Sequence, residues 1–209
     1  RPVKLTITNY PEGQSETFEV ENNPNRPEDG TRTIAFSREL YVEADDFLEV
    51  PVPKYKRLYP GGPECRLKGA YLIKCTGCRK DEAGNVVEIL AEYDPESRGG
   101  NPADGRKVKG ATIHWVDAAP AVAAECRLYD NLFTDPSPDA ADKDFLDCLN
   151  PDSLETVTGC KVEAGLAQAA VPANFQFMRV GYFCLDSKDS APGHLVFNRS
   201  VGLKDSFKV

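Results

Sequence analysis

Two cysteines three residues apart are the first residues whose types and spacing could support chemistry. Cys75 and Cys78 form a Cys-x-x-Cys pair, a spacing found among zinc ligands and redox dithiols. A structural zinc site needs four ligands, usually from two such pairs, and the sequence has no second pair. The two histidines, His114 and His194, lie in an apolar stretch and after a Pro-Gly pair. We therefore interpret both cysteines as ordinary thiols rather than metal ligands or redox groups.

Nucleophilic and acid–base chemistry have little support in the sequence. His114 stands beside Trp115 in an apolar run, where a hydrogen-bonded core histidine is expected rather than a general base. Neither a Gly-x-Ser-x-Gly elbow, a phosphate-binding loop nor a dinucleotide fingerprint occurs. Adjacent carboxylates such as Asp45 and Asp46 are expected to be solvated. We predict no catalytic residue, no metal site and no cofactor site in this chain.

The cationic residues are more informative than the cysteines. Lysine and arginine total 25 against 33 aspartate and glutamate residues, so the formal net charge is −8. This charge opposes the binding of a polyanion unless cations gather locally. Three clusters stand out: residues 54–57 (Lys-Tyr-Lys-Arg), Arg66 with Lys68, and residues 106–109 (Arg-Lys-Val-Lys). A single short basic run is usually a solvated face, so binding depends on how the fold positions these clusters.

The elements that must position these residues are predicted to be strands. Glycine and proline, 16 of each, are spread through the chain, and short alternating runs outnumber helical patterns. Turn signals about every ten residues predict a sandwich or a barrel. Residues 70–74 and 86–93 flank Asp-Glu-Ala-Gly-Asn, which is typical of a hairpin. Residues 112–116 predict a buried strand, and residues 139–149 a short amphipathic helix.

Composition places the chain among globular proteins. Its 209 residues can form one large or two small domains, and no run approaches the roughly 20 apolar residues of a membrane helix. Seven cysteines without a framework spacing predict free thiols in a reducing compartment, which indicates the cytoplasm. Residues 1–10 lack the apolar core of a signal peptide. Because the chain opens on Arg1 instead of methionine, we expect a piece of a longer protein.

A short internal echo relates two stretches of the chain. Residues 63–67 (Pro-Glu-Cys-Arg-Leu) resemble residues 124–128 (Ala-Glu-Cys-Arg-Leu). Two similar β units would explain this likeness, and so would chance. By this comparison Arg66 and Arg127 occupy equivalent places, so Arg66 could equally be a structural residue of a barrel.

Several stretches together resemble the C-terminal anticodon-binding region of the glutaminyl-tRNA synthetases. In family order they are Ile34–Phe47, Lys54–Leu58 with Glu64–Lys74, Pro102–Val116, Phe175–Ser187 and Val196–Asp205. The resemblance implies an all-β fold of two antiparallel β-barrels with short helices, of a kind also seen in a ribosomal 5S-RNA-binding protein. For the topology of the two barrels, we expect residues 30–118 to form one and residues 1–29 plus 119–209 to form the other. The resemblance also implies an upstream catalytic domain that binds ATP with Mg²⁺ and attaches glutamine to tRNA.

The resemblance further implies which residues contact the anticodon. They are Lys54, Tyr55, Lys56, Arg57, Arg66, Lys68, Gln176, Arg179 and Lys204. Arg66 and Lys68 align with the pair at the first base, and Gln176 and Arg179 with the pair that reads the central uridine. Glutamine both donates and accepts, which suits the edge of an unstacked uracil. Strict alternation along a strand turns Gln176 and Arg179 to opposite sides, so a bulge or a strand end is needed there.

At the third base the family places a basic group that corresponds to Arg57 with Lys56. Lys204 aligns with a basic residue near the same loop. Tyr55 sits among charges and is the expected stacking residue. The chain departs from its relatives at Met178, where a charged residue is usual, and an arginine at the central base lies upstream of residue 1.

Other functions stay open on the sequence. The equivalent module of a eukaryote-like glutamyl-tRNA synthetase shares these barrels. A β-barrel interaction domain that does not bind RNA is a second alternative, and a self-contained enzyme or metal protein built on the cysteines and histidines is a third. The resemblance favours a monomer whose partner is the anticodon loop of tRNA-Gln, with no membrane contact.

Overall fold

The computed structural model describes residues 1–140 and 142–203. Its regular elements there are strands and short 3-10 helices, so the predicted all-β class is confirmed. The strands are β1 (Pro2–Ile7), β2 (Ser15–Glu21), β3 (Thr31–Ser37), β4 (Glu39–Glu43), β5 (Cys65–Leu67), β6 (Leu72–Lys80), β7 (Val86–Tyr93), β8 (Thr112–Ile113), β9 (Trp115–Asp117), β10 (Val122–Tyr129), β11 (Leu154–Val162), β12 (Asn174–Phe177), β13 (Gly181–Leu185) and β14 (Leu195–Gly202). The 3-10 helices are η1 (Pro27–Asp29), η2 (Ala44–Asp46), η3 (Pro95–Ser97), η4 (Phe145–Cys148) and η5 (Ala164–Gln168). None of the described helices has the length and apolar character needed to cross a membrane.

The chain divides into two compact units. Unit 1 comprises Arg1–Val122 together with Lys161–Leu166. Unit 2 comprises Ala123–Cys160 and the chain from Ala167 onwards. The chain therefore leaves unit 1 after β9, returns to it for one short segment, and leaves it again.

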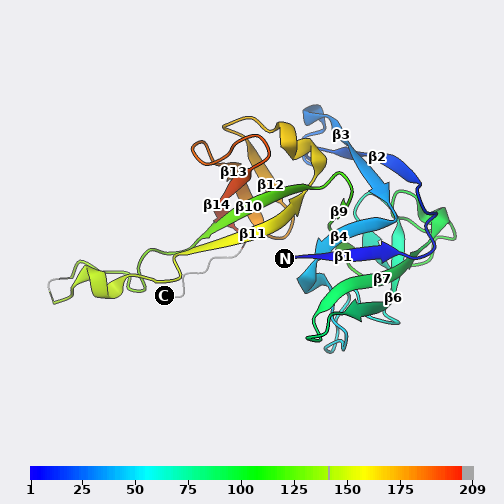
Figure 1. Cartoon of the computed structure of the whole chain (residues 1–209), viewed down its shortest axis with the longest axis horizontal. Coiled ribbons are helices and arrows are strands. Elements are labelled where there is room, and N and C mark those ends of the chain that lie inside the picture. Colours follow the sequence, from blue (N-terminus) through cyan, green and yellow to red (C-terminus); the bar gives the residue numbers. More distant parts are fainter. Residues whose placement is uncertain (141, 204–209) are drawn as a thin grey trace. The chain divides into compact units, whose positions relative to one another are not determined.

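Unit 1 is built on one seven-stranded sheet in the order β8-β5-β6-β7-β1-β4-β9. Figure 1 labels β6, β7, β1, β4 and β9 of this sheet. Strands β8 and β9 lie at opposite ends of this order, yet only His114 separates them in sequence. The continuous chain from Thr112 to Asp117 therefore joins the two ends of the sheet, which curls into a nearly closed barrel. Closure of this kind removes the exposed strand edges that would otherwise pair with other chains.

An aromatic cluster fills the interior of unit 1. The fully buried ring of Phe36 lies edge-on to four other rings, with centroid distances of 5.1 Å to Tyr10, 5.9 Å to Phe18, 5.3 Å to Tyr71 and 5.3 Å to Trp115. Edge-to-face packing at these distances is favourable for aromatic rings. Phe18 and Phe36 come from β2 and β3, so this two-stranded ribbon contributes part of the barrel core.

Strands β6 and β7 form the hairpin predicted from the sequence. They pair from Ile73 opposite Tyr93 to Lys80 opposite Val86. In the turn, Asp81 Oδ1 accepts hydrogen bonds from the backbone amides of Ala83 at 3.0 Å and Asn85 at 2.8 Å. A short polar side chain that bonds the backbone just beyond it favours a turn, which explains why the local sequence was sufficient here.

The N-terminal strand lies elsewhere than expected. We expected residues 1–29 to belong to the second barrel, but β1 pairs antiparallel with β4 and parallel with β7 in the sheet of unit 1. Leu5 and Ile7 of β1 are fully buried there, and this burial stabilises the pairing. Strands β5 and β8, and β10 and β14, also pair in parallel, so neither sheet is purely antiparallel.

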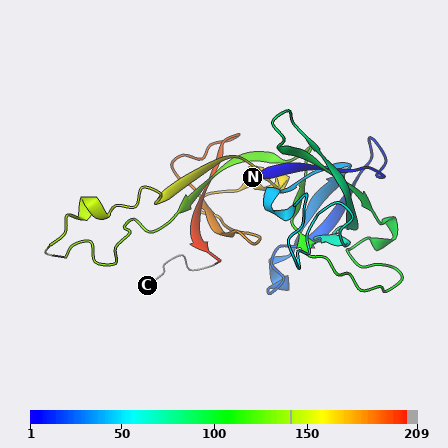
Figure 2. The same cartoon turned by 90° about the horizontal axis from the view of Figure 1, so that it is seen from below.

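Unit 2 contains a five-stranded sheet in the order β11-β10-β14-β13-β12. Three phenylalanines contribute to its packing: Phe177 stacks on Phe183 with a centroid distance of 4.4 Å and lies edge-on to Phe197 at 5.2 Å. The chain between β10 and β11 extends away from this sheet (Figure 2).

The helix expected over residues 139–149 is reduced to the four residues of η4. The side that was predicted to be apolar and buried does not face a core, since Phe145 is 53% and Leu146 is 57% exposed. A short helix is marginal in water unless it packs on another element, and this extended segment offers none. The prediction of an amphipathic helix was therefore wrong for the part of the segment that the structure describes.

Candidate nucleic-acid interface

Arg66 lies on the outer face of the barrel in unit 1. Its strand β5 runs between β6 and β8, where Arg66 is opposite Leu72 and Thr112. Both neighbours in sequence, Cys65 and Leu67, are fully buried, so alternation turns Arg66 outward and leaves it half-buried. Arg66 Nε donates to the carbonyl of Gly100 at 2.8 Å. Within the described chain no other hydrogen bond or ion pair engages this guanidinium, so its terminal nitrogens are available to a ligand.

Lys68 follows Arg66 on a well-anchored stretch of backbone. Its amide donates to the carbonyl of Ile113 at 3.0 Å, and its carbonyl accepts from Trp115 Nε1 at 3.1 Å. The side chain itself is exposed. The backbone thus holds two cationic residues, Arg66 and Lys68, two positions apart at this end of the barrel.

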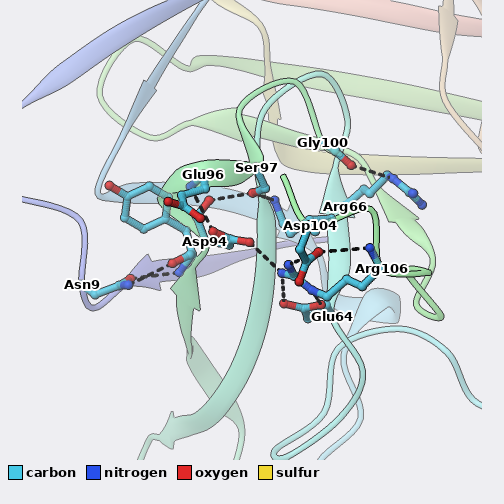
Figure 3. A network of polar contacts seen from close by, with 11 residues as sticks. Asn9, Glu64, Arg66, Asp94, Glu96, Ser97, Gly100, Asp104 and Arg106 are labelled. Atoms are coloured by element: carbon cyan, nitrogen blue, oxygen red, sulfur yellow. Dashed lines mark hydrogen bonds and ion pairs between the residues drawn. The ribbon is translucent and has the colours of Figure 1, made fainter. Parts of the chain in front are cut away.

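The loop that carries Gly100 is fixed at both ends by a polar network (Figure 3). Arg106 pairs with Glu64 at 2.8 Å and with Asp94 at 2.6 Å. The hydrogen bonds that Arg106 donates to these carboxylates hold its pKa above the usual range. Since Glu64 precedes β5 and Asp94 follows β7, Arg106 ties the loop to two strands. The carbonyl of Gly100 is therefore placed beside Arg66 by the fold.

The first half of this loop is anchored by a buried serine. Ser97 Oγ donates to the carbonyl of Asp94 at 2.6 Å and accepts from the amide of Leu72 at 2.9 Å. The amide of Gly99 donates to the carbonyl of Ala70 at 2.7 Å. These bonds attach η3 and the residues after it to β6 and to the turn between β5 and β6.

Arg57, which the resemblance assigns to RNA contact, already has partners within the protein. Its Nη1 lies 3.3 Å from the carboxylate of Asp46, which is almost fully buried, and 3.2 Å from the carbonyl of Asp45. A buried carboxylate needs such a partner, because leaving it unpaired is costly. One edge of the Arg57 guanidinium is thus held by η2, and the group is still half-buried rather than enclosed.

The neighbours of Arg57 differ in their exposure. Lys54 and Lys56 are exposed, and Lys54 has the left-handed backbone conformation with φ of 66°. Tyr55 is half-buried, its hydroxyl donates to the carbonyl of Asp45 at 3.2 Å, and burial raises its pKa. Its ring lies 6.2 Å from that of Tyr59, so one side of Tyr55 is already covered.

In unit 2, Gln176 and Arg179 lie at the end of a strand. Strand β12 ends at Phe177, and the amide of Val180 donates to its carbonyl at 2.9 Å, which closes the turn. Arg179 has φ of 64° in this turn and is exposed, as is Gln176. The strand end needed for these two residues to approach one ligand is present.

Tyr182 is a residue of this region that was not predicted from the sequence. On β13 it lies opposite Gln176 of β12 and Val201 of β14, and it is 47% exposed. Neither its hydroxyl nor its ring has a partner among the described residues. Alternation could have found it, because the next residue, Phe183, is buried in the core and Tyr182 must therefore face outward. Lys204 lies outside the described residues.

The two arginines of the internal echo have different surroundings. Arg127 Nε bonds Glu125 at 2.9 Å and Arg127 Nη1 bonds Asp189 at 2.5 Å. Arg66, by contrast, bonds one backbone carbonyl. Arg127 is thus a structural residue of unit 2, whereas the fork of Arg66 is left open.

The surroundings of Cys75 in the Cys-x-x-Cys pair oppose reactivity of its thiol. All seven cysteines are free thiols. Burial raises the pKa of Cys75 to about 11, and its Sγ donates to the carbonyl of Gly77. A thiol with such a pKa is protonated at neutral pH, which disfavours both metal ligation and nucleophilic attack. No cluster of potential metal ligands occurs among the described residues.

Two family models match this chain, and both describe an anticodon-binding domain of the class I tRNA synthetases for glutamate and glutamine. The first matches residues 1–94 and the second residues 112–186. The chain is 55% identical over 207 residues to the glutamine–tRNA ligase of Aliivibrio salmonicida. This match covers 99% of this chain and 37% of that protein. The chain is 52% identical over 209 residues to the ligase of the same name in Clostridium kluyveri, and this match covers 100% of this chain and 37% of that protein. The chain thus spans little more than a third of the length of these relatives.

Proposed function

Because the chain belongs to the anticodon-binding domains of the class I tRNA synthetases for glutamate and glutamine, we propose that it recognises the anticodon loop of tRNA-Gln. One copy binds one tRNA. By this proposal the longer protein is a cytoplasmic glutamine–tRNA ligase that attaches glutamine to tRNA with ATP. ATP and Mg²⁺ are bound by the catalytic domain of that longer protein. The relatives named glutamine–tRNA ligase support glutamine over glutamate as the amino acid.

The observation that carries this proposal is the state of Arg66. Most arginines of the described chain are paired with carboxylates, as expected in a protein of net charge −8. Arg66 is held by one backbone carbonyl and keeps its terminal donors free on the outer face. A planar fork fixed in this way suits the edge of an unstacked base. We assign Arg66, with Lys68, to the first anticodon base.

For the central uridine we assign Gln176 and Arg179. Both are exposed at the end of β12, and the amide of Gln176 can donate to and accept from a uracil edge. Exposed Tyr182 lies directly across from Gln176 and offers a ring on which a base can stack. The physical requirements of base readout, hydrogen bonds and a stacking surface, therefore coincide in this turn.

For the third base and its phosphate we assign Lys56 and Arg57, with Lys54 and Tyr55 beside them. The ion pair with Asp46 fixes the direction of the Arg57 guanidinium, and the exposed lysines supply flexible positive charge. Lys204 is assigned to the same loop by the resemblance alone.

The proposal is tested by binding of an anticodon stem-loop of tRNA-Gln to the full 209-residue chain at low salt. We expect tighter binding than to the same stem-loop with its central U changed, by about tenfold or more. Arg179→Ala should abolish this difference, because it removes a donor to that base. Lys188→Gln serves as the control, since it removes an exposed cation from the same unit.

Binding of a tRNA-Glu stem-loop tests the alternative that the chain belongs to a glutamyl-tRNA synthetase. This stem-loop shares the central U, so discrimination against it must come from the flanking anticodon bases. Equal affinity for all three RNAs would contradict anticodon recognition and leave only attraction between charges.

A further inference from the structure

The lysines of unit 1 fall into two groups according to their partners. In the first group Lys4 pairs with Glu39 and Lys80 with Glu49. In the second group the ammonium has neither an ion pair nor a hydrogen bond within the described chain, although carboxylates outnumber cations. Four exposed lysines of the second group come from two basic runs: Lys54, Lys56, Lys107 and Lys109.

Backbone hydrogen bonds bring these two runs together. The amide of Ala111 donates to the carbonyl of Lys56 at 2.7 Å, and the amide of Gly110 donates to the carbonyl of Glu64 at 3.1 Å. The close approach requires glycine, because a Cβ at Gly110 would lie 2.2 Å from the Glu64 carbonyl oxygen. The segment with Lys109 therefore runs directly beside Lys56 and the start of β5.

The run at residues 106–109 separates into an anchor and two free cations. Arg106 is held by Glu64, by Asp94 and, at 3.0 Å, by Asp104 (Figure 3). Lys107 and Lys109 are exposed, whereas Val108 between them is half-buried. Arg106 thus fixes the start of a segment that presents two unpaired ammonium groups to solvent.

We propose that Lys107 and Lys109, which lie beside the basic run of Lys54 and Lys56, bind phosphates of the RNA backbone. This inference rests on the proposed function and adds two contact residues to it. Lysine is a compact charge on a flexible stem, which suits a phosphate better than the edge of a base. Such contacts hold the RNA in register without sequence preference, while Arg66 supplies the directional donors.

The test is the salt dependence of stem-loop binding by the full chain. The dissociation constant of the tRNA-Gln anticodon stem-loop is measured between about 50 and about 200 mM KCl for the parent chain and for Lys107→Gln with Lys109→Gln. Loss of two phosphate contacts should lower the slope of log K against log salt by about 1.4 to 1.8. Affinity should fall by the same factor for the stem-loop with the central U changed. Both lysines are exposed and unpaired, so the midpoint of thermal unfolding should stay at the parent value.

Two controls isolate local contact from overall charge. Lys80→Gln with Lys188→Gln removes the same charge elsewhere and should leave the slope near that of the parent chain. Lys107→Arg with Lys109→Arg keeps the charge and should also keep the slope.

The outcomes separate this inference from the proposed function. A slope in the Lys107→Gln, Lys109→Gln variant equal to that of the charge control overturns the phosphate contacts, while preference for the central U still supports anticodon recognition. A selective loss of that preference would also overturn the inference, because it would mean that the lysines contact bases. If the parent chain binds both stem-loops equally, the proposed function fails even where the slope changes. Absence of binding at the lowest salt would contradict both.

Discussion

At the scale of single residues, the hydrogen bond from Arg66 Nε to the carbonyl of Gly100 holds one edge of the guanidinium against the protein. Arg66→Lys keeps the charge but loses the planar fork, so base discrimination should fall while general attraction remains. We expect discrimination at the first anticodon base to drop by about tenfold or more, with little change in the salt slope. Binding of stem-loops that differ only at that base measures both quantities.

Arg127→Lys is the matched control for this change. Arg127 holds the equivalent place in the echo but is bound by Glu125 and Asp189, so its replacement should lower the unfolding midpoint without altering base discrimination. A similar loss of discrimination in both variants would show that Arg66 acts through the fold and not through contact with a base.

The sequence identified candidate cations for RNA binding but could not say which of them are free of partners within the protein. Arg106 and Lys107 are adjacent, yet Arg106 is held by carboxylates from Glu64 and Asp94 while Lys107 is unpaired. Those carboxylates are remote in sequence, and only the closed barrel brings them to Arg106. The pairing of Arg57 was equally hidden in the sequence, because its partner Asp46 was expected to be solvated and is buried instead.

At the scale of elements, the contact between β5 and the segment before β8 depends on a glycine. In Gly110→Ala the new methyl would lie 2.2 Å from the backbone oxygen of Glu64, which a side-chain rotation cannot relieve. We expect a loss of about 1 to 3 kcal/mol of unfolding free energy, since overpacking forces the backbone apart. Denaturant unfolding of the full chain measures this change.

Gly77→Ala provides the comparison for that variant. Gly77 lies on β6, has no heavy atom within 4 Å of the added methyl and needs no left-handed backbone conformation. Gly77→Ala should lower the unfolding free energy much less than Gly110→Ala does. Equal losses of unfolding free energy would mean that the close approach at Gly110 is relieved without strain.

The loop between β13 and β14 is stabilised by an ionised carboxylate. Asp186 accepts hydrogen bonds from the amide of Asp189 at 2.7 Å, from Asn198 Nδ2 at 2.6 Å and from the amide of Lys188 at 2.8 Å. These bonds lower its pKa to about 2, whereas an unfolded aspartate titrates near 3.9. Because the folded pKa is the lower one, the contribution to stability is complete above about pH 4 and is lost as the pH falls towards 2. A carboxyl titration followed by NMR that gives Asp186 a pKa near 3.9 would contradict this account.

Elements were predictable where their signal was local. The β6–β7 hairpin follows from Asp81 and the residues after it, which direct the turn by their own hydrogen bonds. The position of β1 did not follow, because its pairing with β4 and β7 joins residues far apart in sequence, and an alternating strand fits many partners. The short helix at 139–149 failed because periodicity alone does not supply a surface on which to pack.

At the scale of the whole molecule, the path of the chain is what sequence patterns could not reveal. Only the pairing of β8 with β5 and of β9 with β4 shows that Thr112–Asp117 closes a barrel. Only contacts show that Lys161–Leu166 returns to unit 1. The overall class was predictable, since alternation and turns depend on neighbours, whereas closure and return depend on the three-dimensional path.

The returning segment is attached to unit 1 by a two-pronged ion pair. Arg32 Nε and Nη2 donate to Glu163 at 2.6 and 2.9 Å. Burial opposes ionisation of Glu163, but the bonds from Arg32 outweigh it and lower the pKa of the carboxyl. Glu163→Gln should therefore cost about 1 kcal/mol, a value that allows for the partial exposure of Arg32.

This attachment should also depend on pH and be visible as local opening. Since the folded pKa of Glu163 is lowered, its contribution is complete above the unfolded value near 4.3 and is lost as the pH falls through the folded pKa. At neutral pH, Glu163→Gln should speed hydrogen exchange in Lys161–Leu166 while leaving the β6–β7 hairpin protected. Glu155→Gln changes an exposed glutamate of β11 that has no partner in the described chain, and it should leave exchange in the segment unchanged. Exchange in Lys161–Leu166 that matches the parent chain in both variants would mean that packing alone, and not the Arg32–Glu163 pair, holds the chain where it returns to unit 1.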